Sequence, residues 1–174
     1  IRQMRNDVGR ENVLYIHVTL LPYLSSTQEL KTKPTQHSVN ELRRMGIQPD
    51  IIICRSDYPI SEGTRDKISL FCDVKRQAVI SLPTVSTIYE VPLILEEAGL
   101  GQLIVNQLNL KAKPPDLSQW QELVRCLKEC HEPVTITLVG KYVELRDAYY
   151  SVREALHHAA LYHNKDINWL KIKG

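Results

Sequence analysis

The 174-residue sequence lacks the motifs that most directly reveal a catalytic centre. It has no G-x-x-x-x-G-K-[ST] segment, because Gly140-Lys141 lacks both the upstream glycine and the following Ser or Thr, so it contains no phosphate loop. It also has no G-x-C-x-G segment to carry a cysteine nucleophile. Cys126, Cys130 and His131 have no second ligand cluster nearby, and we therefore expect no metal site.

Charge and hydropathy exclude further classes. The net charge of +2 is too small to indicate binding to nucleic acid or to a membrane surface. No apolar run reaches membrane-spanning length, and the N-terminus has no signal-peptide pattern. Cys54 and Cys72 lie in apolar runs, which favours a reduced, cytoplasmic setting over a disulfide scaffold. The first residue is Ile1 rather than Met, and we expect the chain to be a fragment.

Apolar runs alternate with amphipathic segments over the first 110 residues. Strands are predicted at 13–21, 50–54 and 78–82, and helices at 38–46, 64–73 and 93–98. This alternation indicates a parallel α/β sheet, whose strands, the first included, we expect to be buried. Ligands of such sheets bind at the carboxyl ends of the strands, so the loops after Leu21, Cys54 and Leu82 are the candidate positions.

A different pattern follows residue 110. Residues 111–116 have the composition of a linker, and 117–130 form a predicted amphipathic helix. A strand at 134–139, a helix at 148–161 and a strand at 167–172 then complete one β-α-β unit, which is too small to be a domain by itself.

The most informative stretch is the basic segment from Lys31 to Ser38. Pro34 disfavours a helical conformation for Lys33, so an extended run is predicted in which Lys31 and Lys33 point the same way. Ser38-Val39-Asn40-Glu41 is typical of a capping box that begins a helix. Paired ammonium groups beside a helix start predict a polyphosphate site, and Gln36 is suited to the edge of a nucleobase. The alternative is a solvated basic loop.

Two further positions have two interpretations each. Lys67 and Phe71 lie one helical turn apart, where they suit either a phosphate with a base or a surface lysine above a core phenylalanine. His17, within a predicted strand, is interpreted as a hydrogen-bonded core histidine rather than a catalyst.

Four segments, in this order, resemble the CTP synthases, the glutamine-hydrolysing ligases that make CTP from UTP. They are KTKPTQHSV with ELRRMGIQPDIIICRSD, then TRDKISLFCDV, AVISLPTVSTIYEVPLILEEAGL and VTITLVGKYVELRDAYYSVREALHHAA. The resemblance implies that 1–110 form the rear of a P-loop-NTPase-like (dethiobiotin-synthetase-like) synthase domain without its P-loop half. It implies that 111–132 form an interdomain linker, and that 133–174 begin a flavodoxin-like class I glutaminase domain.

The resemblance also implies two sets of binding residues. One would bind UTP and the inhibitory product CTP: Lys31, Thr32, Lys33, Pro34, Thr35, Gln36 and Lys67. The other would lie at the ATP: Arg55, Pro83, Thr84 and Val85. The family more usually has an acidic residue at the position of Thr84, so backbone hydrogen bonds are the expected contact there.

The chemistry implied for the parent protein is ATP-dependent phosphorylation of the UTP 4-oxygen, followed by displacement of phosphate by ammonia from glutamine. Magnesium, GTP as an allosteric activator and a homotetramer belong to the same expectation. The magnesium ligands, the phosphate loop and the glutaminase cysteine are all expected outside this sequence, so it would hold no catalytic residue and be inactive alone. The alternative function is a non-catalytic UTP/CTP-binding regulatory module.

Overall fold

The structure, a computed structural model, describes residues 1–129 and 131–173, without the side chain of Arg146. The chain divides into two units, 1–115 and 116–174, which are described separately. Cys130, the last residue of the predicted amphipathic helix, lies outside the described residues.

A three-stranded parallel sheet forms the centre of the first unit. Its strands lie in the order β1 (Ile16–Leu20), β4 (Ile51–Ser56) and β5 (Val79–Pro83). Four consecutive buried residues, 51–54, make β4 the central strand. The predicted parallel α/β architecture is therefore confirmed at the level of strands and their direction.

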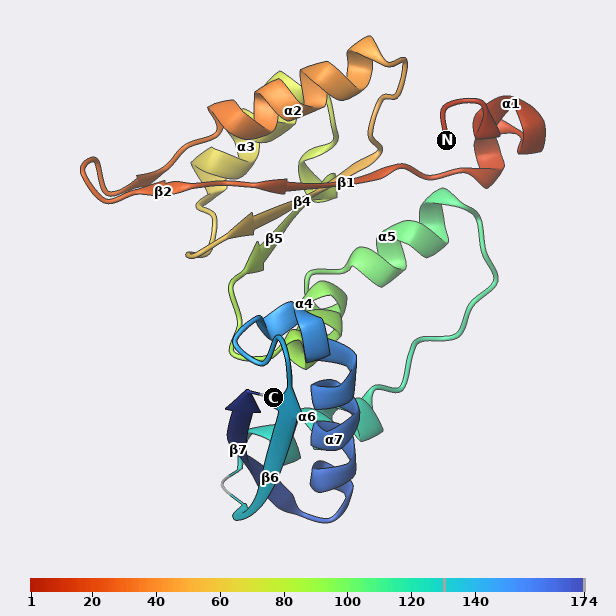
Figure 1. The fold of residues 1–174 in the computed structure, drawn as a ribbon. Coiled ribbons are helices and arrows are strands. Elements are labelled where there is room, and N and C mark those ends of the chain that lie inside the picture. The colour runs from red at the N-terminus through yellow and green to blue at the C-terminus, as the bar shows by residue number, and fades with distance from the viewer. Residues whose placement is uncertain (130, 174) are drawn as a thin grey trace. The chain divides into compact units, whose positions relative to one another are not determined.

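Helices cover the sheet from both sides (Figure 1). On one face, α2 (Lys33–Arg44) and α3 (Glu62–Cys72) bury a cluster that includes Val39, Ile52 and Ile68. On the other face, α4 (Val91–Glu97) and α5 (Leu100–Gln107) enclose Ile51 and Ile53 with Ile80 and Leu100. A short helix, α1 (Met4–Val8), precedes the sheet, and one-turn 3-10 helices occupy Arg10–Asn12, Arg76–Ala78 and Ile88–Glu90.

The prediction that the first strand is buried is wrong for one face of β1. Ile16, Val18 and Leu20 are 39%, 55% and 60% exposed. They point to the same side as Ile51 and Ile53, with which two of them pair in register, but the buried cluster there is built on β4 and β5. β1 is thus an edge strand covered only on the α2 side.

The helix predicted to begin at Ser38 begins five residues earlier, at Lys33. Pro34 lies in its first turn, where a missing N–H costs nothing because no intrahelical acceptor is available. Lys33 is consequently helical rather than extended, and Ser38 lies inside the helix, so the extended run and the capping box were wrong predictions. The predicted end is confirmed, since Gly46 follows the last turn at φ +82°, which favours glycine.

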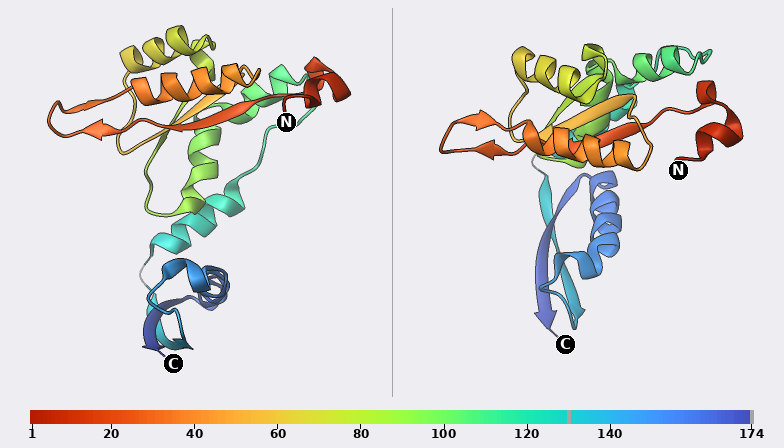
Figure 2. Two further views of the ribbon diagram at one scale, coloured as in Figure 1. Left: turned by 45° about the horizontal axis from the view of Figure 1, so that its top comes forward. Right: turned by 90° about the horizontal axis from the view of Figure 1, so that it is seen from above.

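Between β1 and α2 the chain makes a small antiparallel hairpin, β2 (Tyr23–Leu24) and β3 (Glu29–Leu30). In each view of Figures 1 and 2 this hairpin extends beyond the carboxyl end of β1. It brings the chain from the sheet to the first residues of the basic segment.

The second unit contains the predicted β-α-β arrangement. β6 (Glu132–Gly140) pairs in parallel with β7 (Lys165–Lys173), and α7 (Tyr150–Tyr162) connects them after a 3-10 turn at Arg146–Tyr149. The amphipathic helix α6 (Ser118–Lys128) belongs to this unit by its contacts. Within the described residues of both units, no helix is long and apolar enough to cross a membrane.

Candidate functional site

A cavity of about 500 Å³ lies where the carboxyl ends of β1 and β4 meet α3. Its wall comes from three segments: the hairpin with Thr32, the loop after β4, and the first turns of α3 up to Lys67. This is the edge at which parallel α/β sheets bind ligands. Another cavity, of about 390 Å³, lies at the opposite edge beside Asp50 and Ala78, which precede β4 and β5. The location at the carboxyl edge of the sheet therefore makes the cavity of about 500 Å³ the candidate site.

The start of α3 supplies donors to this cavity. Ser61 caps the helix, since its Oγ accepts a hydrogen bond from the Thr64 N–H at 3.2 Å, and the two hydroxyls are 2.9 Å apart. Lys67 lies on the same side one turn later and is exposed. Among the described residues its ammonium group has no hydrogen bond or ion pair. A capped helix start with an unpaired lysine suits a negatively charged ligand.

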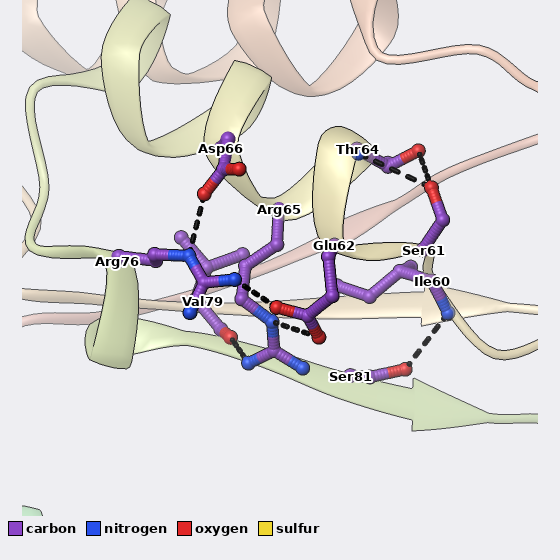
Figure 3. A network of polar contacts seen from close by, with 9 residues as sticks. All are labelled: Ile60, Ser61, Glu62, Thr64, Arg65, Asp66, Arg76, Val79 and Ser81. Atoms are coloured by element: carbon purple, nitrogen blue, oxygen red, sulfur yellow. Dashed lines mark hydrogen bonds and ion pairs between the residues drawn. The ribbon is translucent and has the colours of Figure 1, made fainter.

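A polar network fixes this helix start against the sheet (Figure 3). Arg65 donates from Nη1 to the Val79 carbonyl at 2.7 Å, and the Ile60 N–H donates to Ser81 Oγ at 3.4 Å. Arg76 forms ion pairs with Glu62 and Asp66, the acidic residues of the first two turns (Figure 3). Because Arg76 pairs with both carboxylates, neither of them neutralises Lys67 at the cavity.

Two tyrosines form an aromatic wall that the sequence reasoning missed. The rings of Tyr23 and Tyr58 lie 4.5 Å apart between centroids, tilted by 52°, and both line the cavity. Ser56 Oγ donates to the Tyr58 carbonyl at 2.5 Å, which holds the loop after β4. The available signal was position, because each tyrosine follows closely on the carboxyl end of a predicted strand.

The basic segment contributes unequally to the cavity. Thr32 lines it directly, although little of the residue is exposed, and it counts as buried. Lys31 is half-buried and forms an ion pair with Glu29, a cavity residue. Lys33 and Pro34 are exposed in the first turn of α2 and are not part of the cavity wall.

Thr35 and Gln36 point into the protein instead. The Thr35 hydroxyl is hydrogen-bonded to that of Thr19 on β1, and it is completely buried. Gln36 donates from Nε2 to Thr32 Oγ1 at 3.1 Å and is also buried. These side chains hold α2 and Thr32 in place, so Gln36 lies behind the cavity wall rather than in it.

His17 and Phe71 resolve differently from each other. His17 Nε2 is 2.9 Å from Ser38 Oγ, and burial lowers the pKa of the imidazole, as suits a hydrogen-bonded interior histidine. Phe71 is half-exposed on α3, so the interpretation of Lys67 as a surface lysine above a core phenylalanine is wrong for Phe71.

The residues predicted to lie at ATP gather at the carboxyl ends of β4 and β5. Arg55 is exposed, and within the described part of the chain its guanidinium has no hydrogen bond or ion pair. Thr84 donates its N–H to the Ser56 carbonyl at 2.8 Å and its hydroxyl to Asp57 Oδ1 at 3.0 Å. The Thr84 N–H is therefore already used, which leaves Pro83 and Val85 as the backbone positions for a base.

Residues 1–129 and 131–173 contain no group of three His, Cys, Asp or Glu side chains placed to hold a metal ion.

The described geometry defines an α/β protein with a polar cavity, lined by Lys67, at the carboxyl edge of a parallel sheet. A family described as "CTP synthase N-terminus" matches residues 1–110, which include the whole cavity. The chain belongs to the CTP synthase family.

Individual relatives agree with this assignment. A CTP synthase of Dehalococcoides mccartyi strain BAV1 is 74% identical over 167 residues, which cover 96% of this chain and 31% of the relative. The CTP synthase of Roseiflexus sp. strain RS-1 is 61% identical over 172 residues, 98% of this chain and 31% of its own. The CTP synthase of Thermomicrobium roseum is 60% identical over 164 residues, which cover 94% of this chain and 30% of the relative. The chain thus spans about a third of the length of these relatives.

Proposed function

We propose that this chain is the pyrimidine-nucleotide-binding part of an enzyme that aminates UTP to CTP, and that UTP and CTP share the cavity beside Lys67. The observation that carries the proposal is an unpaired lysine and a capped helix start facing a cavity of about 500 Å³, within the part of the chain that the family matches. That volume falls within the usual range of small-molecule sites.

Each part of the cavity has a distinct task in this proposal. Lys67 and the N–H groups at the start of α3 bind phosphate oxygens by charge-assisted hydrogen bonds. Lys31 leaves Glu29 and binds the same triphosphate from the hairpin side. Thr32, held by Gln36, adds a hydroxyl, and Tyr23 with Tyr58 offers aromatic surface to the sugar or base.

The remaining tasks of the parent protein extend the proposal beyond this cavity. Arg55, Pro83, Thr84 and Val85 contact ATP, and 133–174 begin the glutaminase domain after the segment 111–132. Phosphorylation of the UTP 4-oxygen, ammonia release from glutamine, magnesium binding, activation by GTP and assembly into a homotetramer are assigned to the parent protein. The supporting evidence for these tasks is family membership.

Lys67 on α3 and Lys75 just beyond its end give the test a variant and a matched control. We expect the 174-residue chain to bind UTP and CTP in isothermal titration, and Lys67→Ala to weaken both by about tenfold or more, the effect of one charge-assisted contact. Lys75→Ala removes the same charge at the other end of the helix, and should change neither by more than about twofold. Equal losses in the two variants, or no binding at millimolar UTP, would refute the proposal.

A regulatory module that binds UTP and CTP without catalysis is the competing function. The coding sequence upstream of Ile1 distinguishes them. A G-x-x-x-x-G-K-[ST] segment there supports the enzyme, because phosphoryl transfer needs backbone N–H groups around the β- and γ-phosphates. Its absence from the complete gene supports the regulatory module.

A further inference from the structure

In the second unit, a cysteine lies beside a histidine, and the same histidine lies beside an aspartate. Cys126 Sγ on α6 is 3.7 Å from His131 Nε2, within hydrogen-bonding range for sulfur. His131 Nδ1 is 3.5 Å from Asp166 Oδ1 on β7. A thiol, an imidazole and a carboxylate in this order form the arrangement by which proteins activate a cysteine.

The imidazole of His131 is buried between the thiol and the carboxylate. The side chain is only 3% exposed, and its Nδ1 is buried without a hydrogen-bond partner. Asp166 also accepts the backbone N–H of His131 through Oδ2 at 3.0 Å, which fixes the main chain there, and its Oδ1 lies within ion-pair distance of the ring. Nothing in the proposed nucleotide site requires a buried imidazole here.

Cys126 differs from the other described cysteines in accessibility. It is partly exposed at the surface of α6, whereas Cys54 and Cys72 are completely buried in the first unit. Burial raises the pKa of the Cys54 thiol to about 12, which suppresses its thiolate. Arg125, the neighbour of Cys126, is ion-paired with Glu122 and Glu129, so His131 is the group that can act on the thiol.

We propose that Cys126 is a modification site that exchanges with small-molecule disulfides, with His131 as its base and Asp166 as the residue that positions His131. His131 Nε2 accepts the thiol proton, and the Cys126 thiolate attacks one sulfur of the disulfide R–S–S–R. The bond between the two R–S groups breaks as the Cys126–S–S–R bond forms. The departing R–S⁻ takes the proton from the imidazolium and leaves as R–SH, so Cys126 is oxidised and one R–S group is reduced.

The rate of this exchange tests the proposal without reference to nucleotides. The probe is glutathione disulfide at pH 7, added to the 174-residue chain carrying Cys130→Ser so that no neighbouring thiol intervenes. Peptide mass mapping gives the rate at Cys126 in the folded chain and in urea. We expect the folded rate to exceed the unfolded one by about tenfold, because a free thiol is only a few per cent thiolate at this pH.

Matched histidine variants identify the base. His131→Gln should lower the folded rate to the unfolded value or below, and Asp166→Asn should lower it partly. His163→Gln, an exposed histidine of the same unit, should leave it unchanged. Circular dichroism verifies that each variant is folded. The proposal is wrong if Cys126 reacts more slowly in the folded chain than in urea, a comparison that needs no variant, or if folded His131→Gln reacts at the parental rate.

Discussion

Substitutions of Lys31 and Glu29 should change nucleotide affinity in opposite directions. Lys31 is paired with Glu29, which lines the hairpin side of the cavity. A triphosphate entering the cavity competes with the carboxylate for the ammonium group. Lys31→Ala should therefore weaken UTP and CTP together, whereas Glu29→Gln should tighten both, because it removes the competitor and a repelling charge.

The magnitude follows from two terms. A charge-assisted hydrogen bond to phosphate contributes about 1.5–3 kcal/mol. Breaking the existing ion pair costs about 0–1 kcal/mol, since the two side chains are 32% and 56% exposed. Lys31→Ala should thus cost about 0.5–3 kcal/mol, a rise in Kd of roughly 2- to 160-fold, and Glu29→Gln should lower Kd by up to about fivefold.

Isothermal titration of the 174-residue chain with UTP and with CTP measures both effects. Glu41→Gln, at a half-exposed acidic residue of α2 that pairs with Arg44, is the control for a general change in net charge. The reasoning fails if Glu29→Gln weakens binding, or if Lys31→Ala leaves both dissociation constants unchanged.

Three further predictions concern other residues and the chain as a whole. Gln36→Ala should weaken UTP, CTP and inorganic triphosphate by similar factors in a competition titration, because Gln36 holds Thr32 from behind the cavity wall, and a loss confined to pyrimidine discrimination would contradict this. The chain alone should form no CTP from UTP, ATP, magnesium and ammonia, because it lacks the phosphate loop that orients the transferring group; turnover abolished by Lys67→Ala would contradict this. Burial lowers the pKa of His17 from 6.5 in the folded state, so its stabilising effect is complete above pH 6.5 and is lost as pH falls through the folded-state value. Urea unfolding at pH 7 and pH 5 should show a smaller pH dependence for His17→Gln than for the parent chain.

The parallel strands and most helices were predictable because each has a clear local signal. Residues 51–54 are continuously apolar and form the central strand, and Gly46 ends α2 where a positive φ is needed. The apolar pattern predicts a helix at 93–98 only and does not indicate α5. Gly99 turns the chain at φ +78°, and the helix resumes at Leu100.

The errors arose where tertiary contacts outweigh local preference. Pro34 favours an extended Lys33 locally, yet Thr35 is completely buried and hydrogen-bonded to β1, which requires α2 to begin before it. The β-branched run of β1 has no local signal that distinguishes an edge strand from a central one. The cavity was predictable in position, from strand ends and Lys67, but Tyr23 and Tyr58 meet only through the folding of two distant loops.

The central claim is that UTP binds at the cavity lined by Thr32 and Lys67. Backbone amide shifts of the ¹⁵N-labelled 174-residue chain, followed during a UTP titration, test it most directly because they map even weak binding. We predict saturable shifts concentrated at Thr32, Gly63, Thr64 and Lys67, reproduced by CTP and reduced in Lys67→Ala. Shifts confined to the region of Arg55 and Val85, or no saturable shifts at all, would contradict the claim.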